Sequence, residues 1–220
     1  MKFYVPNLLR GGSFNLLLLS VLLGSCEGPP VARRLPHLGE SDLTATGDTI
    51  WPTVPDFRVR DQDSALVRPA TFAGQVYIAD FFFTTCPTIC PGMQRQLLRV
   101  YSTYKGDKRL AFLSYTIDPD HDSVAVLRTY AHRLGVPTAQ QWHFATAPRD
   151  TIFALARQYL VSAQRDPSAP GGAVHSGAFV LVDPQHHIRG IYDGTNPQET
   201  ERLLRDLPLL LAEAAPAAQR

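Results

Sequence analysis

The chain has 220 residues, of which 45% are hydrophobic and 19% are charged, so it can bury the core of one ordinary domain with appended segments. A formal net charge of +1, without a basic stripe that carries interleaved aromatic residues, argues against a nucleic-acid partner. No repeat with a period of about 20 to 50 residues is apparent, which argues against a solenoid.

The N-terminal segment predicts export rather than a folded element. Lys2 and Arg10 give it a positive start, and a leucine-rich apolar run follows at 14–23. At roughly ten residues this run is too short to span a bilayer as a stable helix. We therefore expect residues 1–25 to form a signal peptide.

Cys26 follows small residues where cleavage is expected, in the stretch Leu23-Gly24-Ser25-Cys26. The stretch resembles the lipobox of bacterial lipoproteins, in which the cysteine is acylated and becomes the new N-terminus. This implies lipidation of Cys26 and a membrane-anchored lipoprotein of the cell envelope, facing the periplasm or the outside of the cytoplasm. Several acyl chains would anchor it durably, because each buried methylene contributes about 0.8 kcal/mol. A plain secretory signal with an unrelated cysteine is the alternative.

Residues 26–49 are rich in Gly, Pro, Ser and Asp and show little periodicity, which predicts a flexible tether. We expect the folded domain at 50–213 and a C-terminal tail at 214–220. The domain would open with an N-terminal β-hairpin, in which an alternating run at 54–60 returns, after a turn, at 65–67.

The rest of the domain alternates between strand and helix patterns. A nearly continuous apolar run at 75–83 is typical of a central strand covered on both faces. Further strands are expected at 110–117, 143–146, 178–182 and 188–192. Helices are expected from about 88–91 onward, at 123–134, at 150–160 with Asp150 as N-cap, and at about 198–212. A polar loop is expected at 162–172. This order predicts an α/β domain with a central mixed sheet and helices on both faces.

Two cysteines follow the central strand, in Cys86-Pro87-Thr88-Ile89-Cys90-Pro91. The chain has three cysteines, so lipidation of Cys26 leaves these two as a pair. A disulfide that closes so short a loop would constrain the unfolded chain little, which favours chemistry over a structural role. Two such thiols can exchange electrons as a dithiol and disulfide, or they can hold a soft metal ion.

The prolines predict that the helix begins around 88–91, because proline is tolerated where the first N–H groups lack partners. Both sulfurs would then lie at the positive end of the helix, which stabilises thiolate. Redox proteins of the thioredoxin type carry two residues between their cysteines, whereas this chain carries three. A disulfide can still form, but two thiolates can also converge on one ion.

A copper ion held by two sulfurs needs a further donor, and His175 is the best candidate. It lies in Gly171-Gly172-Ala173-Val174-His175-Ser176-Gly177, where the glycines make a deformable loop with room for an ion. Neutral imidazole is a good ligand for copper. A lone loop histidine is more often solvated, so this prediction depends on the cysteine pair.

Taken together, the motifs resemble the SCO/SenC family of copper-binding, thioredoxin-fold proteins, which help to assemble the copper centre of cytochrome c oxidase. The matching stretches, in order and spacing over most of 51–211, are the C-x-x-x-C-P block at 80–93, the D-P-x-x-D block at 116–122, and 175–184. The resemblance implies a thioredoxin-like fold and copper, as Cu(I) or Cu(II), bound by Cys86, Cys90 and His175. The implied partner is the copper-bearing subunit of cytochrome c oxidase or another copper protein.

One position departs from the family pattern. Family members commonly carry an aspartate just before the ligand histidine, and this chain carries Val174. Such an aspartate can orient or polarise the imidazole. We therefore expect its absence to affect copper affinity or redox tuning and to leave the ligand set intact.

Other polar residues receive structural interpretations. Asp118 is expected to fix a turn through its side chain, and Asp122 or Ser123 to cap the next helix. Five histidines without a second donor at metal spacing are expected to be solvated or at the edge of the core: His121, His132, His143, His186 and His187. The pair His186-His187 would be at most a weak, adventitious metal site.

Two functions follow from the cysteine pair. A metallochaperone would hold copper in a partly exposed site and pass it to a partner by ligand exchange. A membrane-tethered thiol–disulfide oxidoreductase would use Cys86 to attack a partner disulfide and Cys90 to resolve the mixed disulfide. Both activities can serve one assembly task, and only the first needs His175.

Two further functions fit the sequence less well. A thiol peroxidase would need a threonine or similar group at a spacing that Thr84 and Thr85 do not match. A pure interaction module would leave the cysteine pair unexplained.

Overall fold

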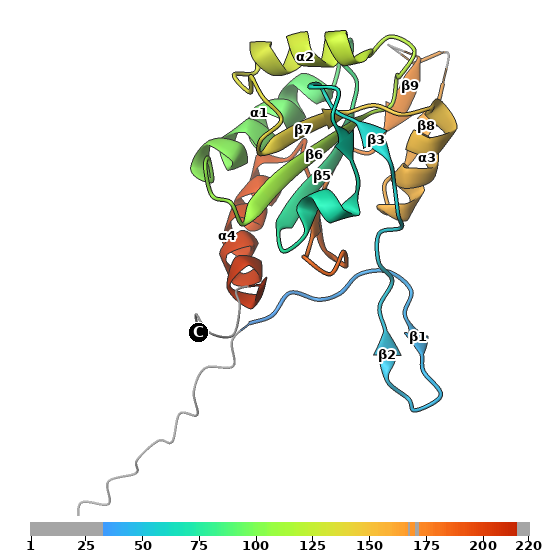
Figure 1. The fold of residues 1–220 in the computed structure, drawn as a ribbon, viewed down its shortest axis with the longest axis vertical. Coiled ribbons are helices and arrows are strands. Elements are labelled where there is room, and N and C mark those ends of the chain that lie inside the picture. Colours follow the sequence, from blue (N-terminus) through green and yellow to red (C-terminus); the bar gives the residue numbers. More distant parts are fainter. Residues whose placement is uncertain (1–32, 167, 170–171, 215–220) are drawn as a thin grey trace, which may run out of the picture. The chain divides into compact units, whose positions relative to one another are not determined.

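The computed structural model describes residues 33–166, 168–169 and 172–214 (Figure 1). The expected signal peptide, the lipidation site Cys26 and nearly all of the expected C-terminal tail lie outside these residues. Among the described residues, no helix is both long and apolar enough to cross a membrane.

A five-stranded mixed sheet lies at the centre of the domain (Figure 1). Its strand order is β11-β10-β5-β6-β7; β5, β6 and β7 run parallel, and β10 runs antiparallel to both of its neighbours. The strands are β5 (Val76–Phe82), β6 (Leu110–Thr116), β7 (Trp142–Ala145), β10 (Ala178–Val182) and β11 (Ile188–Asp193). Every residue of β5 is buried, which confirms the central strand expected from its apolar run.

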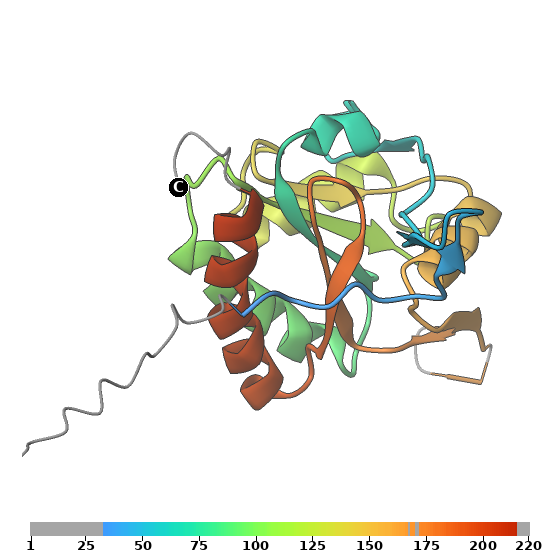
Figure 2. The same ribbon diagram turned by 90° about the horizontal axis from the view of Figure 1, so that it is seen from below.

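Four α-helices surround the sheet: α1 (Cys90–Thr103), α2 (Val124–Arg133), α3 (Arg149–Gln158) and α4 (Pro197–Ala214). A short 3-10 helix, η1 (Pro69–Phe72), precedes β5. Helices α1 and α4 lie side by side on one side of the sheet, and α3 lies on the opposite side (Figures 1 and 2). The predicted α/β architecture, with its thioredoxin-like mixed sheet and helices on both faces, is confirmed.

The polar loop expected at 162–172 is wrong in part. Strand β8 (Ala163–Arg165) pairs antiparallel with β9 (Ala173–His175), and Ala163 lies opposite His175. Strands of three residues are too short to show a period of two in the sequence. This hairpin, and not a loop, carries the candidate histidine.

The N-cap assigned to the third helix is also wrong. Pro148 occupies the N-cap position of α3, and Asp150 lies within the first turn. Pro148 enters the helix with an extended ψ of 141°, and proline suits this place because its ring fixes φ and it has no N–H that needs a partner. Asp150 still lies near the positive end of the helix, where a carboxylate is favourable.

Part of the segment expected to be a tether folds onto the domain. Leu35 is 5% exposed, its carbonyl oxygen accepts a hydrogen bond from Arg189 at 2.6 Å, and the backbone N–H of Leu38 donates to Ile188 at 2.8 Å. Polar partners supplied by distant residues leave no periodic pattern in the segment itself, so the sequence could not indicate this docking.

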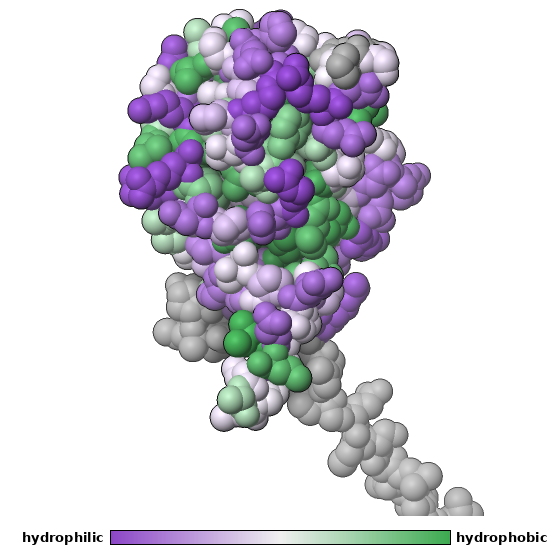
Figure 3. Space-filling model, turned by 90° about the vertical axis from the view of Figure 1, so that its right-hand side faces the viewer, coloured by the Kyte–Doolittle hydropathy of each residue, from purple (hydrophilic) through white to green (hydrophobic). Residues whose placement is uncertain are grey.

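Two small hairpins complete the N-terminal part of the described chain. The predicted one is confirmed, in shorter form, by β3 (Val59–Arg60) and β4 (Leu66–Val67). The other, β1 (Asp42–Leu43) with β2 (Thr49–Ile50), lies within the expected tether. Leu43 and Ile50 are exposed there, and Figure 3 shows apolar surface on this hairpin at the foot of the molecule.

Candidate metal centre

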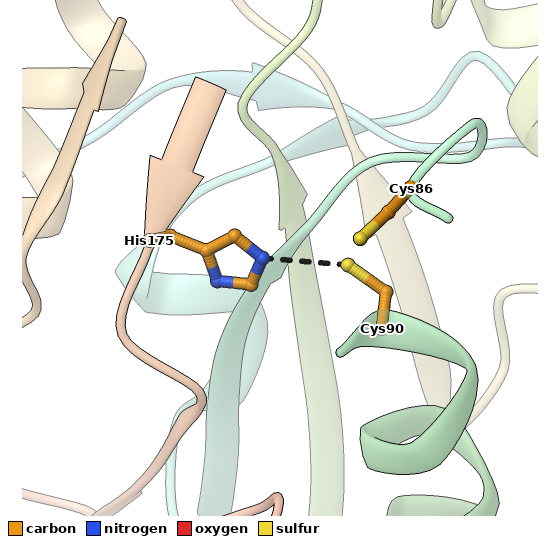
Figure 4. A group of neighbouring side chains, drawn as sticks. All are labelled: Cys86, Cys90 and His175. Carbon is orange, nitrogen blue, oxygen red and sulfur yellow. Dashed lines mark hydrogen bonds between the residues drawn. The ribbon is translucent and has the colours of Figure 1, made fainter. Parts of the chain in front are cut away.

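Cys86, Cys90 and His175 meet beyond the carboxyl end of β5 (Figure 4). Each contributes one donor atom, and the three donor atoms lie within 4.8 Å of one another. The Sγ atom of Cys90 is 3.3 Å from Nε2 of His175. The structure thus brings together all three residues that the sequence nominated, although 85 positions separate Cys90 from His175.

The thiol turn, which we define as residues 84–91, leads from β5 into α1. Helix α1 begins at Cys90, with Ile89 as N-cap and Pro91 in the first turn, as the prolines predicted. Cys86 is 8% exposed and Cys90 is 2% exposed, and both are free thiols. The positive end of the helix favours thiolate at these sulfurs, whereas their burial opposes it.

Asp122 holds the start of this turn in place. Its fully buried carboxylate accepts hydrogen bonds from the backbone N–H and the hydroxyl of Thr84, and from the hydroxyl of Thr116 at the end of β6. Asp122 is therefore not the helix cap. Ser123 caps α2, since its hydroxyl accepts a hydrogen bond from the backbone N–H of Val126.

The backbone of the following residue, Ser176, orients the ring of His175. Nδ1 of its ring lies 3.1 Å from the carbonyl oxygen of Ser176. A carbonyl can only accept a hydrogen bond, so Nδ1 carries a proton and Nε2 is the ring nitrogen that faces the sulfurs. The Ser176 carbonyl thus supplies the orientation that an aspartate before the histidine would give, while Val174 is 37% exposed.

The connection from the histidine to β10 passes close to α1. A Cβ atom placed on Gly177 would lie 3.3 Å from Sδ of Met93 and 2.6 Å from Cγ2 of Thr195. Only glycine allows this approach without displacing a neighbour. Gly177 therefore sets how near the histidine hairpin comes to the helix that carries Cys90.

The two thiols differ in acidity. Burial raises the pKa of Cys86, but hydrogen bonds from His175, from Cys90 and from the backbone N–H groups of Cys90 and Thr88 outweigh it and lower that pKa to about 6. Burial, and then the nearby Cys86 thiolate, raise the pKa of Cys90 well above its usual range. At neutral pH the centre therefore holds one thiolate, at Cys86, and one thiol, at Cys90.

Asp80, which was not among the predicted site residues, carries a buried carboxyl group in β5, the strand that leads into the thiol turn. Asp80 of β5 is fully buried and accepts hydrogen bonds from the side chains of Ser114 and Gln94. Burial raises the pKa of Asp80 to about 6, against the lowering effect of those two hydrogen bonds. The available signal was an acidic residue inside an otherwise apolar strand, which requires polar partners when it is buried.

The centre opens into a small hollow of about 180 Å³, lined in part by Phe83, Cys86, Val174 and His175. A water molecule takes about 30 Å³ of liquid volume. The hollow can thus admit an ion and an incoming ligand atom from one side while the sulfurs stay buried.

The donor set suits a soft metal ion. Typical metal–sulfur and metal–imidazole bonds of about 2.3 and 2.0 Å require sulfur and nitrogen to lie roughly 3.5 Å apart, which is close to the 3.3 Å between Cys90 and His175. Thiolates select Cu(I), and imidazole also suits copper. Small shifts of these side chains would complete a three-coordinate site.

Two of the histidines that were expected to be solvated or at the edge of the core lie against a carboxylate. His121 lies 2.6 Å from Asp118, whose carboxylate also pairs with Arg149, so Asp118 does fix its turn through its side chain. His143 is buried and lies 2.9 Å from Asp61. His187 differs, because the fold places it beside His37 and Asp183. The sequence gives no sign of this cluster, since His37 is nearly 150 positions from Asp183 and His187.

The fold and the site define a thioredoxin-like protein whose buried dithiol faces one histidine. The chain belongs to the SCO1/SenC family, whose model matches residues 48–210. The SCO1 protein homolog of Bacillus subtilis is 25% identical over 156 residues, which cover 70% of this chain and 80% of that protein.

Solved structures of the family share the fold. The structure of BsSco, described as a member of the Sco family of cytochrome c oxidase assembly proteins with a disulfide switch, gives a TM-score of 0.63 at 24% identity over 72% of this chain and 93% of its own. Yeast Sco1 with copper bound gives a TM-score of 0.56 at 25% identity over 77% of this chain and 94% of its own.

Proposed function

We propose that this protein is a copper metallochaperone, in which Cys86, Cys90 and His175 hold one copper ion for delivery to a partner. The observation that carries the proposal is the convergence of two sulfurs and one imidazole nitrogen within 4.8 Å. The copper-bound yeast Sco1 structure supports it. The partner we propose is the copper-bearing subunit of cytochrome c oxidase, or another copper protein, in line with the description of BsSco.

The acidity of the thiols sets the order of events during loading. Cys86, with a pKa of about 6, offers a thiolate at neutral pH and is the first ligand that an incoming ion meets. Cys90 must then give up its proton, since thiolate is the ligating form. Nε2 of His175 faces the sulfurs and would bind the ion through its lone pair, as neutral imidazole does.

Release follows from the arrangement of the ligands. The sulfurs are buried in the domain, whereas His175 lies on a peripheral hairpin beside the hollow. A partner thiolate or imidazole that enters the hollow can replace His175 first and the sulfurs afterwards. Stepwise exchange of this kind never requires a free ion in solution.

The lowered pKa of Cys86 also favours a second function, thiol–disulfide exchange. The Cys86 thiolate would attack a disulfide of the partner. This attack joins Cys86 to one partner sulfur in a mixed disulfide and releases the other partner sulfur as a thiolate. Cys90, after losing its proton, would attack the Cys86 sulfur and release the second partner thiolate. The partner gains two electrons, and Cys86 and Cys90 end as a disulfide.

We also propose that Cys26 is acylated and anchors the protein in a membrane of the cell envelope. The lipobox-like stretch before Cys26 supports this proposal. Mass spectrometry of the mature N-terminus should find a lipid-modified cysteine at position 26. An unmodified N-terminus elsewhere would indicate a plain secretory signal.

An anaerobic copper titration of the reduced protein tests the metallochaperone proposal. We expect one Cu(I) per chain, and a thiolate–Cu(II) charge-transfer absorption when Cu(II) is supplied. Cys86→Ser and Cys90→Ser should each abolish stoichiometric binding, because each removes one of three donors. Cys26→Ser is the matched control and should bind one copper as before. A Cys86→Ser or Cys90→Ser variant that still holds one Cu(I) tightly would place the site elsewhere.

A further inference from the structure

A second group of metal-binding side chains lies away from the thiol centre. His37, Asp183 and His187 each place one donor atom within 4.8 Å of the other two. Asp183 and His187 belong to the turn between β10 and β11, at the end of β10 opposite to His175. Five residues of β10 separate the two groups by about 17 Å. We propose that His37, Asp183 and His187 form a second site, which binds a divalent first-row transition-metal ion such as Zn²⁺.

The fold holds the three side chains in place without an ion. Trp51 stacks on the ring of His37 with 5.3 Å between ring centroids, and the rings of His37 and His187 meet edge to face at 5.0 Å. The hydrogen bond from the backbone N–H of Leu38 to the carbonyl oxygen of Ile188 holds the segment that carries His37 beside the β10–β11 turn. A site assembled in advance binds more tightly, because little conformational entropy remains to be lost.

His187 carries a buried nitrogen that lacks a hydrogen bond. Its Nδ1 lies 3.4 Å from Oδ2 of Asp183, and among the described residues it has no hydrogen-bond partner. A buried polar atom without a partner costs about 1–3 kcal/mol. An ion bound between His37, Asp183 and His187 would satisfy this nitrogen.

The local charges leave room for a cation. Oδ1 of Asp183 accepts two backbone hydrogen bonds, and Oδ2 lies 3.1 Å from Nη1 of Arg189. Arg189 also pairs with Glu213 at 2.7 Å. Two carboxylates therefore face one guanidinium, a net charge of −1. Oδ2 of Asp183 can contact both Arg189 and an ion, because a carboxylate oxygen accepts more than one partner. The ion pair between Arg189 and Glu213 would remain in place.

The donor chemistry separates this site from the thiol centre. Two imidazole nitrogens and one carboxylate oxygen suit Zn²⁺ or Cu²⁺, with water completing the coordination, whereas thiolates select Cu(I). His37 comes from the N-terminal segment and the other two ligands from the β10–β11 turn. A bound ion would therefore tie the N-terminal segment to the domain.

Equilibrium dialysis with Zn²⁺ tests the proposal on the full chain in detergent. A Cys86→Ser/Cys90→Ser double variant removes the thiol centre and should still bind one Zn²⁺ per chain. Adding His37→Ala or His187→Ala should weaken this binding more than about 100-fold, since even an outer partner of a ligand is worth 10- to 100-fold. His132→Ala, on α2, is the matched control and should leave Zn²⁺ binding unchanged.

Tryptic cleavage gives a second measurement at the same site. Arg33 and Arg34 are exposed and lie just before His37. Saturating Zn²⁺ should slow cleavage there at least about tenfold in the double cysteine variant, because opening the segment then requires loss of the ion. His37→Ala, which removes a half-buried side chain at the edge of the domain, should abolish this protection without unfolding the protein.

Either of two results would overturn the proposal. One is a double cysteine variant that retains no Zn²⁺; the other is Zn²⁺ binding that His37→Ala and His187→Ala leave unchanged. Neither result touches copper binding at the thiol centre, because that site is absent from the variant. Conversely, failure of the copper titration in the wild-type protein would leave the Zn²⁺ measurement valid.

Discussion

The thiol turn and the histidine hairpin supply ligands to the same centre but are built differently. In the thiol turn, Cys86 and Cys90 are buried and Asp122 fixes the start of the turn. The hairpin formed by β8 and β9 has two strands of three residues each, and its Val174 is exposed. Two ligands are thus part of the core, and the third lies on an element of low local stability.

This difference matters to a protein that must both hold and release an ion. A ligand on a lightly packed hairpin can move aside while the domain stays folded. Buried sulfurs keep the ion until a competing ligand arrives. The comparison indicates that the sulfurs set retention and that His175 controls access, and four measurements test this division.

Among these four tests, the largest expected effect is that of His175→Ala. We expect copper affinity to fall more than about 100-fold, because a direct ligand is lost and outer partners alone are worth 10- to 100-fold. The dithiol should still form its disulfide, because both sulfurs remain, although more slowly at neutral pH, because the hydrogen bond from His175 that lowers the pKa of Cys86 is lost. A Cu(I) competition titration and a thiol assay measure the two properties. Affinity equal to that of the wild type would remove His175 from the ligand list.

Asp122→Asn should have a smaller effect that spreads over the thiol turn. The amide group loses the acceptor for the hydroxyl of Thr84 or of Thr116, so we expect a loss of about 1–3 kcal/mol in the free energy of unfolding. Copper affinity should fall about tenfold, as when the orientation of a ligand is disturbed. Urea unfolding and copper competition measure both.

Asp120→Asn is the matched control for that variant. Asp120 pairs with Arg149, but its side chain is 69% exposed, and exposed pairs contribute at most about 1 kcal/mol. If the two variants destabilise the protein and weaken copper binding equally, Asp122 has no special role in the thiol turn.

The two regions also differ in how far the sequence predicted them. The thiol turn is local: an apolar strand, two prolines and two cysteines lie within one short stretch, and each indicates its structure without reference to distant residues. The hairpin depends on pairing between Ala163 and His175, across a stretch of mixed polar residues. Its strands are too short to show periodicity, so their pairing could not be predicted.

The sequence did not predict the roles of residues whose partners are distant in the chain. Asp122 resembled a helix cap because it precedes α2, but its partners are Thr84 and Thr116. Asp80 and the group around His187 depend on contacts between separate elements. Residue types and spacing predicted which groups could bind copper, and only the fold showed what orients them.

The pH dependence of the thiols gives a third, smaller effect. Cys86 should alkylate with a midpoint near pH 6, with a rate that rises as pH rises and thiolate forms, whereas Cys90 should stay unreactive at neutral pH. Among the thiols, copper binding should then displace about one proton at pH 7.5, from Cys90, and more protons should be released at pH 5, where Cys86 is also protonated. Iodoacetamide kinetics and titration in dilute buffer measure these. Release of two protons at pH 7.5 would show that Cys86 is an ordinary thiol.

The smallest expected effect is that of Val174→Asp, which restores the residue common in the family. Val174 borders the hollow but is 37% exposed, so water can solvate a carboxylate at this position. Nδ1 of His175 is already bound to the Ser176 carbonyl. The new charge is solvated and contributes at most about 1 kcal/mol, so copper affinity should change less than about fivefold. Val174→Asn controls for shape without charge.

A larger change would alter the account of the hairpin. If Val174→Asp raised copper affinity by 10- to 100-fold, as a newly gained partner of the ligand would, and Val174→Asn did not, the carboxylate would have displaced the Ser176 carbonyl from Nδ1. The hydrogen bond between Nδ1 of His175 and the Ser176 carbonyl would then be too weak to hold the ring in place. A change within fivefold would instead show that the backbone alone orients His175, and that the family's aspartate is dispensable in this chain.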